Sequence, residues 1–321
     1  MTLEELRTEC VRLWNVERFE DIFILNEIYK SCLFKIMTEH APVVGEKGSL
    51  KEAKIIGQMM FTKLAHLEQV CAGVTFSTGP GGKTLNHIID ATVVGSMVRG
   101  VFESVSVFNM VYVNPETEDQ RLILYCLWVI SGLNYRQRFL GQVILPENIK
   151  KGAEEKILID KYTKAIEETA LYQSLKETDQ KKLHNQIDQK KYSVYFDKNK
   201  LTVINGFQEA ITRAGIRPKI MDNMYNYFSL NAHPSNVAVF QFAQMFDSQS
   251  PEFLKMTTFN MKNVYMLLSV FIADYLKMFP GVLSTFEKLP IRDQIVINFL
   301  NIFSRTDAYT INNCLLALDD H

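Results

Sequence analysis

The sequence lacks an excess of charge of either sign. Its 321 residues include 35 Lys and Arg against 36 Asp and Glu, which gives a formal net charge of −1. Without a broad basic surface, the chain is not expected to bind long nucleic acid through charge alone, although a local basic patch would still attract phosphate groups.

Cysteine is also scarce. The five cysteines are far apart and form no Cys-x-x-Cys pair; they are Cys10, Cys32, Cys71, Cys126 and Cys314. A scattered, odd set of this kind is typical of unbridged thiols in a reducing compartment. The first ten residues, MTLEELRTEC, have no apolar core of the signal-peptide type. We therefore expect a cytoplasmic protein.

Sequence signatures of metal and cofactor sites are missing as well. There is no His-Glu-x-x-His motif, no Glu-x-x-His pair of a di-iron bundle, no Cys/His zinc spacing and no Gly-x-Ser-x-Gly motif. We predict neither a metal nor a cofactor.

The most membrane-like run covers residues 88–113. Three charged residues interrupt it: Asp90, Arg99 and Glu103. Charges at bilayer depth are costly, so the run is better interpreted as a buried helix of a bundle than as a membrane span. No membrane partner is expected.

Apolar residues recur at spacings of three and four along most of the chain, which predicts helices. The predicted helical segments are 3–38, 49–72, 84–113, 116–141, 206–214, 218–233, 236–246, 259–279 and 290–304. Because strands do not alternate with helices, a doubly wound sheet is excluded. The sequence predicts an all-α multi-helix bundle with at most a short hairpin, which residues 192–204 would form.

We expect residues 1–321 to form a single domain, with 147–204 as a charged helical and extended insertion that projects from the bundle. Charges of both signs alternate at helical spacings within this insertion. They fit either a solvated pair of helices or an arm that binds a partner. Apolar helices of a bundle also allow a homodimer.

The glycine-rich stretch 75–90, TFSTGPGGKTLNHIID, resembles part of a phosphate-binding loop. Gly82, Lys83 and Thr84 match the end of the pattern G-x-x-x-x-G-K-[ST], but its first glycine is replaced by Ser77. Pro80 also removes a backbone donor. We interpret the stretch as a loop between two helices, with Thr84 as the cap of the second.

Polar residues at positions with a buried pattern form the main candidate site. Arg99 and Glu103 lie one turn apart in an apolar helix. Tyr225, Ser229 and His233 are spaced by four and share a broad face. Pro234 should end that helix at about His233, where imidazole is suited to acid–base chemistry.

A third polar place is the segment 134–139, which contains Tyr135, Arg136 and Arg138. Together with Arg99-x-x-x-Glu103 and the run from Tyr225 through Ser229 and His233 to Ser235, it resembles a bacterial family of unknown function whose members are cytoplasmic helical proteins. The resemblance covers roughly residues 84–140 and 218–245 and implies an α-helical fold.

More distantly, the chain is similar to the HEPN helical bundles, some of which are metal-independent ribonucleases of cell defence. Their hallmark, an Arg followed four to six residues later by a His on one helix, is not present here. A nuclease would need Arg99 to face His233 from another helix.

These residues leave three interpretations open. In the first, Arg99, Glu103, Tyr225, Ser229 and His233 form a buried structural network of a binding or scaffold module. In the second, they bind a phosphate-containing ligand. In the third, they form a catalytic site for RNA or another phosphodiester. Arg99 would then hold phosphate, Glu103 would orient Arg99, Tyr225 or Ser229 would hydrogen-bond the substrate, and His233 would act as general acid or base.

Overall fold

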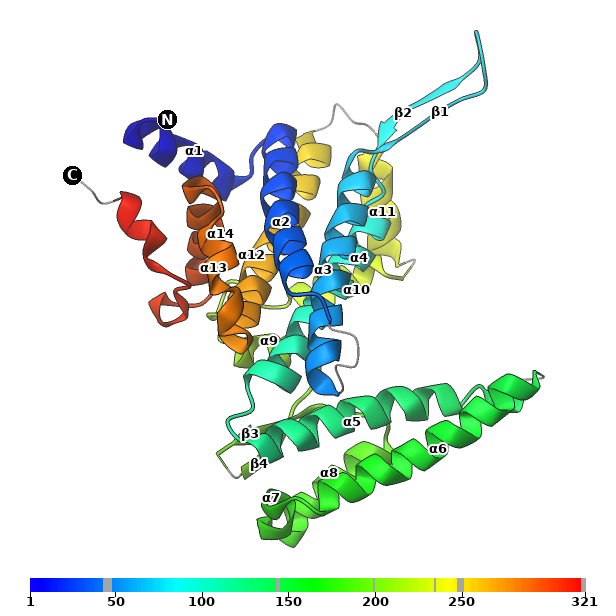
Figure 1. Ribbon diagram of the computed structural model, residues 1–321. Helices are drawn as coiled ribbons and strands as arrows, with labels where there is room; N and C mark the ends of the chain where they lie inside the picture. Colours follow the sequence, from blue (N-terminus) through cyan, green and yellow to red (C-terminus); the bar gives the residue numbers. More distant parts are fainter. Residues whose placement is uncertain (43–47, 143–144, 199, 234, 247–250, 319–321) are drawn as a thin grey trace. The chain divides into compact units, whose positions relative to one another are not determined.

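The computed structural model describes residues 1–42, 48–142, 145–198, 200–233, 235–246 and 251–318 (Figure 1). Within them the chain forms fourteen α-helices and two small antiparallel sheets. The prediction of an all-α multi-helix bundle is confirmed. The chain divides into two compact units, Met1–Phe108 with Ile211–His321, and Asn109–Ala210. The second unit includes the segment 147–204 but begins well before it.

The first unit contains most of the helices. They are α1 (Leu3–Asn15), α2 (Phe19–Glu39), α3 (Ser49–Cys71), α4 (Ala91–Phe108), α10 (Met224–Asn231), α11 (Asn236–Met245), α12 (Pro251–Met278), α13 (Leu283–Glu287) and α14 (Ile291–Ser304). It also contains strands β1 (Val74–Ser77) and β2 (Thr84–Ile88), and the 3₁₀ turns Pro280–Val282, Asp307–Tyr309 and Asn313–Leu318. Helix α9 (Phe207–Arg213) crosses the boundary between the units.

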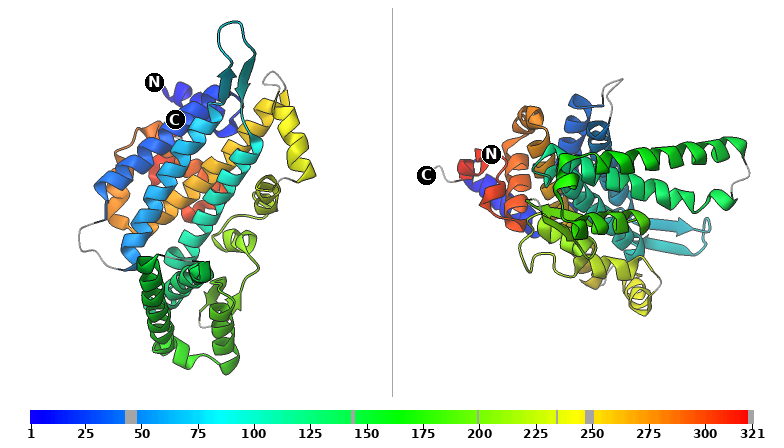
Figure 2. Two further views of the ribbon diagram at one scale, coloured as in Figure 1. Left: turned by 90° about the vertical axis from the view of Figure 1, so that its right-hand side faces the viewer. Right: turned by 90° about the horizontal axis from the view of Figure 1, so that it is seen from below.

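The core of the first unit lies among α2, α3, α4 and α12, which lie side by side in Figures 1 and 2. Helix α12 is buried along most of its length. Two of its buried hydroxyls are paired inside the core: the Ser269 hydroxyl lies 2.6 Å from that of Tyr29, and Tyr265 donates a 2.9 Å hydrogen bond to the Ile22 carbonyl. Apolar burial drives this packing, and the paired hydroxyls remove the cost of burying polar groups.

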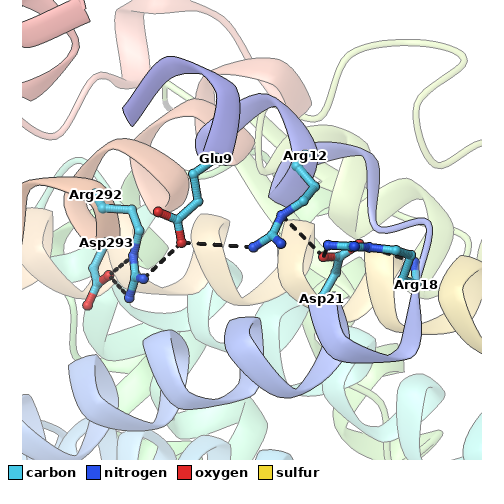
Figure 3. A network of polar contacts seen from close by, with 6 residues as sticks. All are labelled: Glu9, Arg12, Arg18, Asp21, Arg292 and Asp293. Atoms are coloured by element: carbon cyan, nitrogen blue, oxygen red, sulfur yellow. Dashed lines mark hydrogen bonds and ion pairs between the residues drawn. The ribbon is translucent and has the colours of Figure 1, made fainter. Parts of the chain in front are cut away.

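A chain of ion pairs joins α1, α2 and α14 (Figure 3). Asp21, which is fully buried, lies 3.1 Å from Arg18 and 3.4 Å from Arg12. Arg292 lies 3.1 Å from Glu9 and 2.9 Å from the neighbouring Asp293. The charges of Arg12, Arg18 and Arg292 balance those of Glu9, Asp21 and Asp293, so this network ties the helices together without net charge.

A second ion pair is sealed inside the first unit. Arg305, at the end of α14, is fully buried and contacts Asp274 of α12 through two nitrogen–oxygen pairs, at 2.7 and 2.8 Å. The Arg305 guanidinium also lies 4.5 Å from the centre of the Tyr309 ring. The 2.8 Å contact is a hydrogen bond that Nη2 donates, and the 2.7 Å contact of Nη1 adds a close charge pairing.

The second unit begins with the π-helix Asn109–Val113, which continues directly from α4. Its elements are α5 (Glu118–Gln137), the 3₁₀ turn Leu140–Gln142, α6 (Pro146–Glu167), α7 (Ala170–Ser174), α8 (Glu177–Asp188), β3 (Val194–Asp197) and β4 (Lys200–Val203). Helices α5 and α6 pack side by side, and Gln137 donates a 3.1 Å hydrogen bond to the Gly152 carbonyl (Figure 1). Strands β3 and β4 form the hairpin expected within 192–204.

The interpretation of the glycine-rich stretch is wrong. It forms a second hairpin, in which Ser77 of β1 pairs with Thr84 of β2, and this hairpin projects from the helices of the first unit (Figures 1 and 2). Gly79 and Gly81 take positive φ values of 112° and 74° in its loop. The loop therefore joins two antiparallel strands, and it lacks the strand-to-helix setting of a phosphate-binding loop.

Several predicted helix starts also move. Helix α4 begins at Ala91, because the Asp90 carboxylate accepts a 2.8 Å hydrogen bond from the Thr92 backbone N–H and acts as its cap. Thr117 caps α5 in the same way. Helix α10 begins at Met224, so the helix predicted from 218 is shorter at its N-terminal end.

The helical run Ala91–Val113 is long and apolar enough to cross a membrane, and 56% of its most apolar window is buried against the rest of the protein. The bent pair Pro251–Met278 and Pro280–Glu287 passes the same test when taken together. Burial of this kind is typical of a core helix, as residues 88–113 were expected to be.

Candidate functional site

The candidate residues lie where α10 packs on α4. Gly95 makes close contact possible at one end of this interface, since a Cβ atom there would come within 2.6 Å of the Asn231 Cβ. At the other end, Phe102 packs against the Tyr225 ring with 5.6 Å between ring centres. The interface thus brings residues more than a hundred positions apart into one cluster.

Arg99, Glu103 and Tyr225 form a closed polar triad. Arg99 donates one 2.9 Å hydrogen bond to Glu103 and another to the Tyr225 hydroxyl. The Tyr225 hydroxyl donates in turn to the same Glu103 oxygen, at 2.9 Å. The tyrosine hydrogen is therefore used inside the triad, and the positive and negative charges are paired.

The electrostatics of the triad do not favour acid–base chemistry. Burial and the adjacent Glu103 carboxylate raise the pKa of Tyr225 above its ordinary value, although Arg99 opposes this. Tyr225 therefore stays protonated at neutral pH. The Arg99 guanidinium also lies 5.1 Å from the centre of the Tyr225 ring, a cation–π contact that adds to the pairing.

Arg99 and Glu103 were predicted to be buried, but in the structure both side chains are only partly buried. The side chains of Arg99 and Glu103 keep 28% and 32% of their surface exposed. Tyr225 and Ser229 are half-buried as well, and His233 is exposed. The apolar residues around Arg99 and Glu103 in the sequence indicated full burial. The helix face that carries these two residues, however, lies at the rim of the helix packing.

The remaining predicted residues do not join the triad. The Ser229 hydroxyl donates to the Tyr225 carbonyl, at 2.7 Å, so its hydrogen is used within α10. His233 lies in the turn after α10, and Ser235 caps α11 by accepting a hydrogen bond from the Ala238 backbone N–H. Pro234 lies outside the described residues. No hydrogen bond is found between His233 and another described side chain.

Tyr135, Arg136 and Arg138 belong to the second unit and have partners there. Arg136 pairs with Glu155 of α6. The Arg138 guanidinium lies 4.9 Å from the centre of the Tyr135 ring. The Arg136–Glu155 pair ties the end of α5 to α6, and the Arg138–Tyr135 contact lies within the end of α5.

A further candidate site is a cavity that the sequence did not predict. It has a volume of about 760 Å³ and lies among α3, α4, α10 and α11. Lys63 and His66 of α3 line it, as do Ser96 of α4, Asn231 of α10 and the predicted His233. Lys63 and His66 are three residues apart on one helical face, a spacing visible in the sequence, but their meeting with α10 and α11 depends on tertiary packing.

The cavity and the triad are neighbours on the same two helices but are not the same site. Arg99, Glu103 and Tyr225 are not among the described residues that line the cavity. The triad instead ties α10 to α4, and so positions the end of α10 that carries Asn231 and His233. Among the described residues, no group of three His, Cys, Asp or Glu side chains comes together as metal ligands.

Comparison of the chain with protein-family models, with curated proteins and with solved structures finds no match.

Proposed function

We propose that this chain is a cytoplasmic helical binding module without catalytic activity. The observation that carries the proposal is the triad: Arg99 and Glu103 of α4 and the Tyr225 hydroxyl of α10 are hydrogen-bonded to one another. Contacts of this kind hold two helices together and need no ligand or substrate.

The triad also explains how such a module would be built. It holds α10 against α4, and both helices supply walls of the neighbouring cavity. A cavity of about 760 Å³ is in the size range of small-molecule sites, which is roughly 300–1,000 Å³. The proposal therefore assigns a structural role to the triad and the binding role to the cavity.

Metal-independent cleavage of RNA is the second candidate. It is favoured by the presence of two imidazoles, His66 and His233, and one ammonium group, Lys63, around a single cavity. Imidazoles serve as general acid and base, and an ammonium group neutralises phosphate. The sequence predicted Arg99 as the group that would hold the phosphate, but in the structure Arg99 is hydrogen-bonded within the triad.

Two measurements separate these functions. Tyr225→Phe removes one hydroxyl from the triad and should lower the free energy of unfolding by about 1 kcal/mol in urea titrations, since a half-buried hydrogen bond is lost. His233→Ala, at an exposed position, should leave the free energy of unfolding nearly unchanged.

Neither the wild-type protein nor any variant should cleave single-stranded RNA in the presence of EDTA. Cleavage by the wild type that disappears in His233→Ala would refute the binding-module proposal in favour of the ribonuclease.

A further inference from the structure

The cavity among α3, α4, α10 and α11 has an apolar wall. Its apolar lining residues come mainly from α4 and α11, and they are Val93, Met97, Ala232, Ala238, Val239 and Phe242. Such a wall fits the hydrocarbon or aromatic body of a small molecule.

Lys63 supplies the positive charge of the same cavity. It lies on α3, and none of the described residues that line the cavity is acidic. Lys63 forms no ion pair with a described residue, so no described carboxylate neutralises its charge. Its ammonium group lies over the gap left by Gly100 of α4, where a Cβ atom would come within 2.9 Å of Nζ.

Asn231 adds a buried amide to these groups. It is only 3% exposed, it lines the cavity, and its Oδ1 has no hydrogen-bond partner among the described residues. Buried polar side chains of folded proteins are normally paired, so an unpaired amide oxygen in a cavity wall marks a place where a hydrogen-bond donor of a ligand would bind. The close contact at Gly95 fixes the position of this side chain.

From these observations we infer that the cavity binds an amphipathic small-molecule anion, with its carboxylate or phosphate head at Lys63, a hydrogen-bond donor of the ligand at the Asn231 amide oxygen, and its apolar body against α11. The inference rests on the proposed binding function and names its ligand class. The ammonium group supplies the charge, the amide oxygen accepts a hydrogen bond from the ligand, and the apolar wall supplies most of the buried area.

The test uses four ligands that share one alkyl chain and differ in the head group: octanoate, octyl phosphate, 1-octanol and octylamine. Isothermal titration calorimetry of the full chain should show that at least one of the two anions binds roughly tenfold or more tightly than 1-octanol, a difference typical of one charge-assisted contact. Octylamine should bind weakest, since it places a like charge beside Lys63. The tighter of the two anions identifies the head group as carboxylate or phosphate.

Substitutions in the cavity test where the head group and the apolar chain of the ligand bind. Lys63→Met keeps the apolar stem and should weaken the anion about tenfold while leaving 1-octanol unchanged. Asn231→Asp keeps the shape of the side chain and should weaken the anion by repulsion. Ser96→Trp should fill the cavity and abolish binding of all four ligands. Lys35→Met, on α2 and away from the cavity lining, is the matched control and should bind as the wild type does.

Equal affinity for anion, alcohol and amine, equal losses in Lys63→Met and Lys35→Met, or no binding of any of the four ligands would overturn the inference. Because Lys63→Met changes a half-buried side chain, it keeps the test decisive if Asn231→Asp does not fold. The proposed function fails on a different result, His233-dependent cleavage of RNA, so the two failures are distinguishable.

Discussion

At the scale of single residues, the clearest energetic feature is the sealed pair of Asp274 and Arg305. Removing one partner of a buried ion pair leaves the other charge without compensation, and Arg305 has no exposed surface through which water could reach it. Asp274→Ala should therefore lower the free energy of unfolding by about 3–5 kcal/mol, measured by urea unfolding of the first unit.

The matched control is Glu27→Ala in the same unit. Glu27 is 71% exposed, and its partner Lys30 keeps a second carboxylate, that of Glu68 at 2.7 Å. Exposed pairs contribute little, so this change should cost less than about 0.5 kcal/mol. Similar losses in the two variants would mean that the Asp274–Arg305 pair is not the buried contact described here.

The residue scale also shows what the sequence could and could not reveal. The pairing of Arg99 with Glu103 was predictable, because two residues four positions apart on a helix always share a face. The spacing of Tyr225 and Ser229 was read correctly as helical, but spacing alone cannot say which hydroxyl reaches another helix. Lys63 and Asn231 carried no local signal, since they meet only through the packing of α3 and α10 against α4.

At the scale of elements, the α4–α10 contact depends on a glycine. Gly95→Ala would place a Cβ atom 2.6 Å from the Cβ of Asn231, which cannot move without its backbone. Over-packing of this kind costs typically about 1–3 kcal/mol, more than the roughly 1 kcal/mol that alanine gains over glycine in a helix. Gly95→Ala should therefore destabilise the first unit in urea titrations and weaken ligand binding in the cavity.

Gly100→Ala in the same helix is the control for that prediction. The neighbour of a Cβ atom at position 100 is the flexible end of Lys63, which can move away. The gain in helix propensity should then dominate, and the free energy of unfolding should stay equal or rise by up to about 1 kcal/mol. A stabilising effect of Gly95→Ala as well would contradict the close contact.

The elements that the sequence predicted well are those with a strong helical period, such as α3 and α14. The hairpin of β1 and β2 was missed for a physical reason. Its strands are four and five residues long, and the residues of β1 are exposed on both faces, so their alternation carries no burial signal. The glycine loop was compatible with a helix entrance as well as with a hairpin turn, because glycine permits both.

At the scale of the whole molecule, the first boundary between the two units left no mark in the composition. The boundary falls between Phe108 and Asn109, inside one continuous helical run, where α4 passes directly into the π-helix. Domain boundaries are normally recognised by exposed linkers rich in glycine, proline or polar residues. A boundary inside an apolar helix can be found only from the packing, since each unit buries its own set of side chains.

The five thiols offer a test of whether the two units unfold separately. Cys126 lies in the second unit and the other four cysteines in the first, and all five are free and buried. Burial raises the pKa of Cys126 to about 12 and, helped by the adjacent Glu9 carboxylate, raises that of Cys10 to about 11. At about pH 8 the folded protein therefore presents almost no reactive thiolate, and labelling requires unfolding.

We expect Cys126 to react at lower urea concentration than the four other thiols. The second unit is the smaller of the two, and a smaller unit buries a lower fraction of its surface and is less stable. Pulse labelling with N-ethylmaleimide across a urea series, read by mass spectrometry of peptides, measures each thiol separately. A single transition shared by all five thiols would show instead that the units unfold as one cooperative body, because labelling of each site follows the opening of the structure around it.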